Sequence, residues 1–159
     1  MSSLSARVQQ VLSPKAGKNI IVTVGNSLRA DDGAGPYIGS KIKSRPDLIV
    51  FNAGYNPENI ITNIVELDPV QVIFLDAANF GKKAGTVEVV DLKSIPEVTI
   101  STHTIPLSLV AKILEKDTKA AINFIGIQVK NVQLGDKLSP EVKESADKII
   151  KQIKEEMYA

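Results

Sequence analysis

The sequence predicts an α/β fold, a three-layer sandwich in which helices cover both faces of a mixed, mainly parallel five-stranded sheet. Three observations predict this class. Short apolar runs alternate along the chain with segments of helical spacing, as in parallel sheets. The first strand is a continuous apolar run, which is typical of burial on both faces. One connection between strands is too short for a helical crossover, so one strand is expected to be antiparallel, at or near an edge.

The first predicted elements are a helix and a strand. Apolar residues at helical spacing predict a helix over Ser2–Leu12, which Pro14 ends. The run NIIVTV predicts a buried strand over Asn19–Val24. A second helix is expected over Ala34–Ile42, and LIVF at Leu48–Phe51 is the second strand.

The middle of the chain continues the alternation. A helix over Asn59–Leu67 is ended by Asp68–Pro69. The run VQVIFL over Val70–Leu75 predicts the third strand, which ends on Asp76. After a glycine-bounded turn, the alternation over Thr86–Val90 predicts the fourth strand, the antiparallel one.

The last elements are a helix, a strand and a long helix. A helix is predicted over Ile105–Leu114, and AINFIGI over Ala121–Ile127 is the fifth strand. Ser139 is expected to be the N-cap of the final helix and Pro140 its first residue. Its apolar residues form one stripe and its charged residues the opposite, solvated face.

Composition excludes several classes of protein. A chain of 159 residues predicts a single domain over 1–159. The net charge of +1 gives no electrostatic case for nucleic acid or an acidic membrane surface. The absence of cysteine excludes disulfides, thiolate nucleophiles and iron–sulfur ligation. We find no signal peptide and no apolar stretch of membrane-spanning length, so a cytoplasmic protein is expected.

Acidic residues and the only histidine follow three predicted elements. The loop after the first strand, residues 25–35, carries Asp31 and Asp32, the third strand ends on Asp76, and His103 precedes a helix. Functional sites in open α/β sheets gather at the carboxyl ends of the strands, so we expect these residues to converge. Carboxylates with one imidazole suit nickel, zinc, iron or manganese.

Each of these residues also has a structural interpretation. Asp31 or Asp32 would be the N-cap of the next helix, and Asp76 would accept hydrogen bonds from loop amides. A single histidine, here His103, is more often structural than a ligand. The residues alone leave both interpretations open.

Other enzyme classes lack their patterns. The glycine loop is neither G-x-G-x-x-G nor a P-loop, and a single histidine excludes the two-histidine zinc-protease motif. A serine hydrolase is disfavoured because no G-x-S-x-G is present. A glycosidase could use Asp32 and Asp76, but the chain has no tryptophan for a sugar platform.

Four stretches of the chain resemble the hydrogenase maturation endopeptidases, most closely the branch that serves formate-hydrogenlyase-type (group 4) hydrogenases. They extend from Asn19 to the last helix: VGNSLRADDGAGPYIGSKI, NAGYNPENIITNIVELDPVQVIFLDAANFGKKAGTVEVVD, STHTIPLSLVAKILEK and FIGIQVKNVQLGDKLSPEVKESADKII. The resemblance implies a mixed five-stranded sheet between helices, in agreement with the pattern.

The resemblance also implies a site. Carried over by motif, the metal-contacting and catalytic residues are Asp32, Asp76 and His103, with Asp31 a weaker candidate for the first position. The nickel is expected to belong to the substrate, with no resident metal. Asn26, Asp31 and Gly54 are expected to border the substrate.

The implied function is an endopeptidase that removes the C-terminal extension of a nickel-loaded [NiFe]-hydrogenase large-subunit precursor. The partner is that precursor, and the protein is expected to be a monomer. The alternative is a non-catalytic maturation chaperone of the same fold that binds nickel or the precursor.

Overall fold

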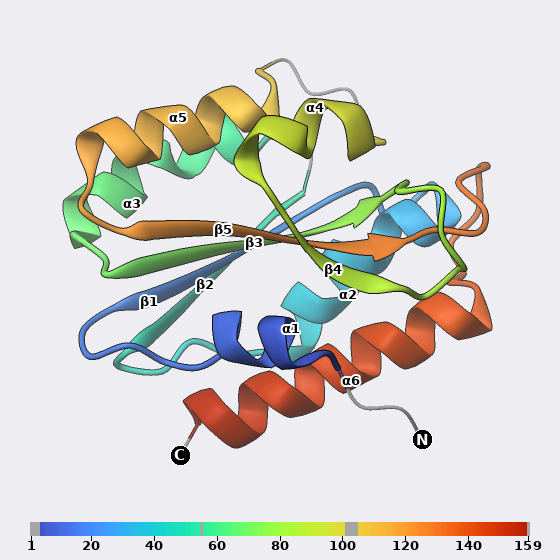
Figure 1. Ribbon diagram of the computed structural model, residues 1–159, viewed down its shortest axis with the longest axis horizontal. Coiled ribbons are helices and arrows are strands. Elements are labelled where there is room, and N and C mark those ends of the chain that lie inside the picture. The colour runs from blue at the N-terminus through green and yellow to red at the C-terminus, as the bar shows by residue number, and fades with distance from the viewer. Residues whose placement is uncertain (1–3, 55, 101–104, 159) are drawn as a thin grey trace.

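A five-stranded sheet lies between two layers of helices in the computed structural model, which describes residues 4–54, 56–100 and 105–158 (Figure 1). The strands are β1 (Asn19–Val24), β2 (Leu48–Gly54), β3 (Gln71–Ala78), β4 (Val87–Val90) and β5 (Ala121–Gln128). The α-helices are α1 (Ala6–Val11), α2 (Ala34–Lys41), α3 (Ile61–Leu67), α4 (Ile95–Val98), α5 (Leu107–Asp117) and α6 (Pro140–Met157). Three short 3₁₀ helices precede α-helices: η1 (Ala30–Gly33), η2 (Pro57–Ile60) and η3 (Leu92–Ser94).

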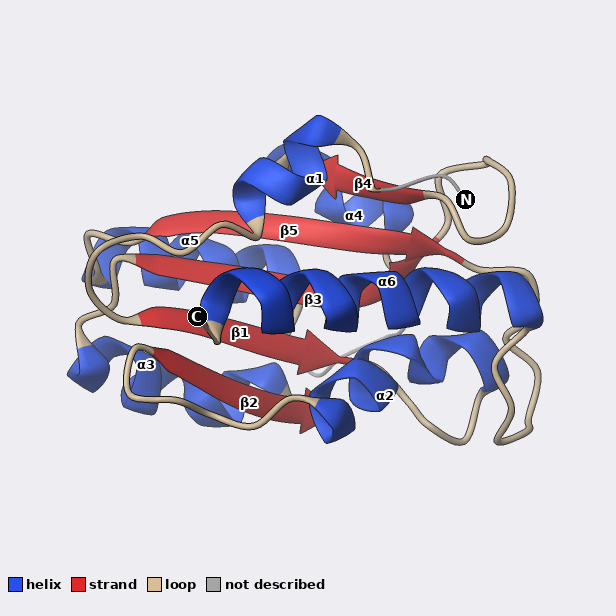
Figure 2. Ribbon diagram, turned by 90° about the horizontal axis from the view of Figure 1, so that it is seen from below, coloured by secondary structure: helices blue, strands red, loops and turns tan. Residues whose placement is uncertain are grey.

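The strand order is β2-β1-β3-β5-β4, with four parallel strands and β4 antiparallel at one edge (Figure 2). Helices α1, α2 and α6 cover one face, and α3, α4 and α5 cover the other (Figure 1). This arrangement confirms the predicted fold class and the antiparallel edge strand. The crossovers pass through helices because parallel neighbours cannot be joined by a tight turn.

Two apolar cores fill the layers. Successive residues of β1 alternate between them: Ile21 belongs to the core under α1, α2 and α6, while Ile20 and Val22 belong to the core under α3, α4 and α5. Every residue of β1 and β3 is buried. A strand that is buried on both faces needs apolar residues at every position, which is why NIIVTV predicted a central strand.

Several element boundaries differ from the prediction. Strand β2 continues to Gly54, and β3 continues to Ala78 because its residues 76–78 pair with β5. Asp76 therefore lies inside β3 and does not follow it. The sequence analysis missed η3 and α4, whose single turns are too short for a periodic signal. Among the described residues, no helix has the length and apolar character that crossing a membrane requires.

Candidate active site

The carboxyl ends of β1 and β3 bring the first loop and Asp76 together. In the parallel ladder Thr23 pairs with Leu75, so Asp76 lies beside the end of β1. After β1, the chain turns through residues 25–29 into η1, and η1 packs against β3. Both Asp32 and Asp76 are almost fully buried. The predicted convergence of these two acids is therefore present.

Two glycines allow this close approach. A Cβ on Gly25, whose φ is +143°, would lie 2.1 Å from the carbonyl oxygen of Asp32. A Cβ on Gly35 would lie 2.1 Å from the carbonyl oxygen of Val24. Both distances are impossible for real atoms, so only glycine lets the first loop and α2 sit directly on the strand ends.

Asp31 and Asp32 are adjacent but have different surroundings. The Asp31 carboxylate is fully buried and accepts four hydrogen bonds from the loop between β5 and α6. The donors are the amides of Lys130 (2.8 Å), Asn131 (2.9 Å) and Ser139 (2.6 Å) and the Ser139 hydroxyl (2.8 Å). Asp31 is thus an anchor between two loops. Both of its carboxylate oxygens accept hydrogen bonds within the protein, and the predicted substrate contact by Asp31 stays a prediction.

Neither acid caps a helix through its side chain. Gly33 occupies the N-cap position of α2, and no side-chain hydrogen bond caps that helix. Ser139 is the N-cap of α6 and Pro140 its first residue, as predicted. Its hydroxyl, however, donates to Asp31, and its oxygen accepts no hydrogen bond from the first amides of the helix.

Backbone hydrogen bonds reinforce the Asp31 anchor. The amide of Ala30 donates to the carbonyl of Gly135 (2.7 Å), and the amide of Asp31 donates to that of Asn131 (2.9 Å). Ala30 has a φ of +47°, a left-handed conformation that costs an alanine roughly 1 kcal/mol. The surrounding hydrogen bonds hold this strain at the residue that precedes Asp31 and Asp32.

The surroundings of Asp76 disfavour its charged form. Burial raises the pKa of Asp76 well above its ordinary value, the negative charge of Asp32 raises it further, and the backbone amide of Ala77 acts in the opposite direction. Neither carboxylate oxygen of Asp76 has a properly oriented hydrogen-bond donor in the described part of the chain. A buried acid pair of this kind holds a proton or is compensated by a bound cation.

Asn26 and Gly54 border the same loop. The side-chain oxygen of Asn26 accepts a hydrogen bond from the backbone amide of Leu28 (2.9 Å), and the backbone amide of Asn26 donates to the carbonyl of Asp32 (2.9 Å). Gly54 ends β2 with a φ of +59°, and its carbonyl accepts a hydrogen bond from the amide of Gly25 (3.1 Å). The loop contact considered for Asn26 is thus present, and a substrate contact by either residue stays a prediction.

The predicted ligand His103 lies outside the described residues. Within the described ranges, no three acidic, histidine or cysteine side chains form a group that could hold a metal. Sequence reasoning also missed Gln128, a buried amide at the end of β5. Its oxygen accepts hydrogen bonds from the amides of Phe80 (2.7 Å) and Lys82 (3.3 Å), so it organises the β3–β4 connection beyond Asp76.

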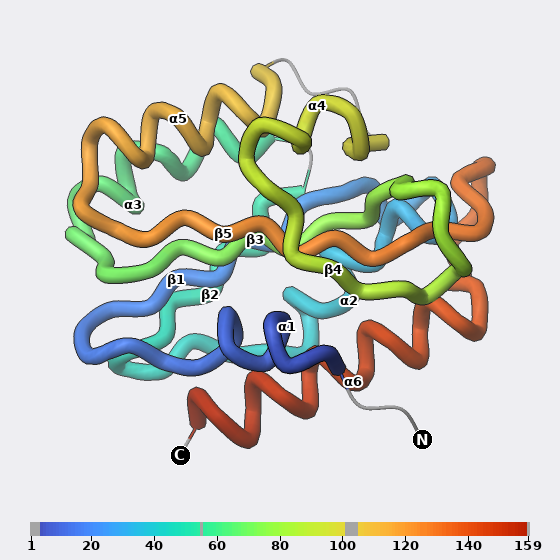
Figure 3. Tube along the Cα trace, viewed as in Figure 1, coloured from blue at the N-terminus to red at the C-terminus, as the bar shows by residue number. Residues whose placement is uncertain are grey.

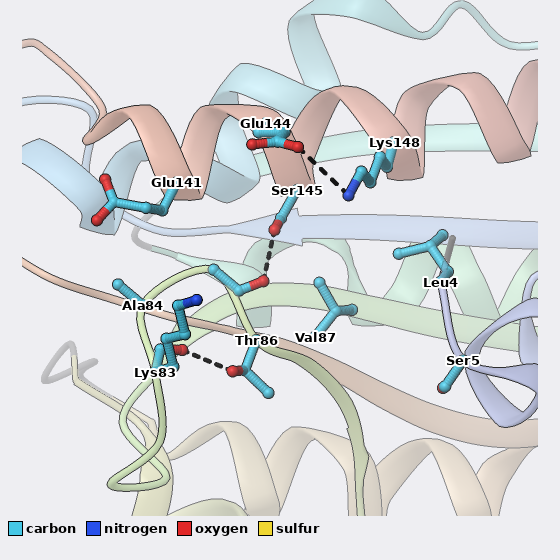
Figure 4. Close-up of a pocket in the computed structure, with 11 residues that line it drawn as sticks. Leu4, Ser5, Lys83, Ala84, Thr86, Val87, Glu141, Glu144, Ser145 and Lys148 are labelled. Atoms are coloured by element: carbon cyan, nitrogen blue, oxygen red, sulfur yellow. Dashed lines mark hydrogen bonds and ion pairs between the residues drawn. The ribbon is translucent and has the colours of Figure 1, made fainter. Parts of the chain in front are cut away.

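A cavity of about 400 Å³ lies elsewhere, between α6 and the start of β4 (Figure 4). Its lining includes Lys83, Glu144 and Lys148, and Glu144 pairs with Lys148 (3.5 Å). None of the predicted site residues lines this cavity. The acid pair is therefore a buried site at the strand ends and not part of this hollow.

Comparison with known proteins identifies the family to which this chain belongs. The family model for hydrogenase maturation proteases matches residues 37–156. The Hydrogenase 3 maturation protease of Escherichia coli is 30% identical over 138 residues, which are 85% of this chain and 88% of that protein. The chain belongs to the hydrogenase maturation protease family, a family of hydrolases.

Solved structures agree with this assignment. The crystal structure of the [NiFe] hydrogenase maturation protease HycI from Thermococcus kodakarensis KOD1 has a TM-score of 0.85 at 30% identity, covering 97% of this chain and 100% of that one. The solution structure of the endopeptidase HycI from Escherichia coli has a TM-score of 0.77 at 28% identity, covering 87% and 90%. The predicted family is therefore confirmed.

Proposed function

We propose that this protein is an endopeptidase that removes the C-terminal extension of a [NiFe]-hydrogenase large-subunit precursor after nickel has been inserted. Asp32, Asp76 and His103 contact the nickel of the precursor, so the metal belongs to the substrate. The observation that carries the proposal is the buried Asp76 carboxylate beside Asp32, in a chain of the hydrogenase maturation protease family.

The chemistry of the acid pair supports recognition of a metal. Without a cation, burial and the negative charge of Asp32 raise the pKa of Asp76 and so favour its protonated form. A divalent nickel ion offsets both effects, and its binding releases that proton. Carboxylate and imidazole ligands also suit nickel. Three protein ligands leave coordination positions that the precursor itself fills.

Hydrolysis follows from the same arrangement. The nickel orients the scissile segment and withdraws electron density from its carbonyl. Water adds to the carbonyl carbon, the C–N bond breaks, and the products are a carboxylate on the mature subunit and an amine on the released peptide. Burial of Asp32 and Asp76 limits bulk water at the metal, which strengthens these electrostatic effects.

Intact-mass spectrometry of a cognate large-subunit precursor tests the proposal. The precursor is incubated with this protein with and without inserted nickel. Loss of a C-terminal peptide from the nickel-loaded form alone is the expected result. A verified cognate precursor that is bound but never cut would instead identify a maturation chaperone, the alternative function.

Substitutions test the roles of the three residues. Asp32→Ala, Asp76→Ala and His103→Ala are each expected to abolish processing while the circular dichroism spectrum stays native. Asp117→Ala, which removes an exposed acid at the end of α5, is the matched control and should process normally. Full processing by all three variants would eliminate the nickel-contact assignment.

We further propose that the whole chain is one domain that acts as a cytoplasmic monomer.

A further inference from the structure

Two exposed leucines lie in neighbouring segments: Leu28 in the loop after β1 that carries Asp31 and Asp32, and Leu134 in the β5–α6 connection. Leu28 is 64% exposed and Leu134 is 88% exposed, although both are large apolar side chains. The amide of Gly135 donates to the carbonyl of Leu28 (2.9 Å), and Arg29 forms a parallel β-bridge with Gly135. The bridge therefore places Leu28 and Leu134 in neighbouring register, each one residue before a bridge partner. We call this pair the leucine ridge.

The leucine ridge protrudes from the carboxyl edge of the sheet. The β5–α6 connection, drawn orange-red, extends beyond the strand ends at the right of Figure 3. Leu28 is four residues from Asp32 in the same loop. The ridge thus lies on the two chain segments that frame the acid pair.

Hydrogen bonds hold the backbone that carries the ridge. Asp31 accepts four hydrogen bonds from the segment 130–139, and Ala30 donates to Gly135. The side chains of Leu28 and Leu134 nevertheless remain exposed. A loop backbone that is ordered before binding loses less conformational entropy when a partner docks.

We propose that Leu28 and Leu134 dock an apolar segment of the hydrogenase precursor and so deliver its nickel to the acid pair. This inference rests on the proposed function and adds the surface that selects the substrate. Two exposed cations, Arg29 and Lys137, and one exposed acid, Asp136, flank the leucines, so the surround carries a net positive charge. The segment that fits therefore carries more acidic than basic residues next to its apolar ones.

The ridge by itself is too small to hold a second copy of the chain. When a partner covers them, the two leucine side chains remove only about 200 Å² of apolar surface from water. A stable dimer needs about 800 Å² per partner. The ridge is therefore an anchor within a larger contact, as expected for a protein that is also held at its nickel.

The test is the kinetics of processing of the nickel-loaded cognate precursor. Leu28→Ser with Leu134→Ser is expected to raise KM about 10-fold and to leave kcat within about twofold, because interface leucines contribute to binding and not to chemistry. Leu134→Ser alone, at the more exposed position, should give an intermediate KM with unchanged thermal stability. Raised ionic strength should weaken wild-type binding, since Arg29 and Lys137 flank the ridge.

Two matched controls isolate the ridge. Gln133→Ser alters the same loop without removing an apolar side chain, and Leu109→Ser removes an exposed leucine from α5. Both should keep the wild-type KM. An unchanged KM in the double variant, or an equal rise in Leu109→Ser, would overturn the proposal. A fall in kcat alone would also overturn it, because the ridge would then act only by supporting the acid loop.

Binding measurements separate this inference from the proposed function. Wild-type protein that binds the precursor through the ridge but does not cut it would refute the peptidase and retain the docking surface. Wild-type protein that cuts, with an unaffected double variant, would refute the docking surface alone. A wild-type dimer that the leucine substitutions dissociate would assign the ridge to self-association, and a wild type that neither binds nor cuts would remove both proposals.

Discussion

The Asp31 anchor makes a quantitative prediction for Asp31→Asn. The substitution keeps the volume of the side chain but replaces one carboxylate oxygen with an amino group that cannot accept hydrogen bonds. In the wild type, one oxygen accepts from the Ser139 amide, and the other accepts from the amides of Lys130 and Asn131 and from the Ser139 hydroxyl. Asparagine therefore retains at most three of the four bonds.

The cost follows from these bonds. The Ser139 amide would face an amino group and lack an acceptor, which costs about 1–3 kcal/mol of folding free energy. The three retained bonds change from charge-assisted, at about 1.5–3 kcal/mol each, to neutral, at about 0.5–1.5 kcal/mol each. Asparagine also avoids the desolvation cost of a buried carboxylate, which offsets part of this loss, so the net loss of folding free energy is about 2–5 kcal/mol. Asp31→Ala, which keeps none of the bonds, belongs at the upper end.

Urea denaturation followed by circular dichroism measures this loss as a shift in midpoint at constant slope. Asp136→Asn is the matched control because it removes an exposed acid from the same loop, and it should change stability by less than about 0.5 kcal/mol. A loss below about 1 kcal/mol for Asp31→Asn, or one equal to that of Asp136→Asn, would refute the anchor.

Three further predictions concern the core of the site. Asp76→Asn should be more stable than the wild type by about 1–3 kcal/mol at pH 8, and this gain should fade toward pH 4. The reason is that the raised native pKa of Asp76 makes wild-type stability fall as pH rises. A gain that thermal melts show to be independent of pH would contradict this. Gly35→Ala should lower the free energy of unfolding by about 3 kcal/mol or more, because its Cβ meets the Val24 carbonyl. The control Gly81→Ala, which has open space around it and a φ of +71°, should lower it by only about 1 kcal/mol. Equal urea midpoints for the two variants would show that the strand ends can move apart. Gln128→Ala should lower the free energy of unfolding by about 2 kcal/mol, because it leaves two amides of the β3–β4 connection without an acceptor. Hydrogen exchange at those two amides should become faster, and unchanged protection would refute the role of Gln128.

Local pattern predicted most of the elements. The apolar run of β1 and the Ser-Pro start of the amphipathic α6 carry their signals in consecutive residues, so the bounds of β1 and the first residue of α6 agree with the structure. The extension of β3 through Asp76 had no such signal, because an acid in a buried strand contradicts the local pattern. Pairing with Gly126 on β5 holds Asp76 in the strand. The interruption of the pattern marked the candidate site and not the end of the strand.

The two acids of the first loop show where sequence reasoning stopped. Asp31 and Asp32 are chemically identical and adjacent, and either could have been the anchor or the site residue. Contacts with the segment 130–139, about a hundred residues further along the chain, give Asp31 the structural role. Proximity to Asp76 on β3 gives Asp32 its electrostatic partner. No pattern within the loop contains either contact.

The sequence by itself determined the alternation of strands and helices, the antiparallel edge strand and the family of the chain, because these depend on residue order and local spacing. Tertiary structure alone decided which acid is buried against which partner, how Ala30 is held in a left-handed conformation and why Leu28 and Leu134 stand together in water. These features arise where segments distant in sequence meet, and their energies come from desolvation and hydrogen bonding between those segments. Folding creates these interactions, and they give the acid pair its chemistry.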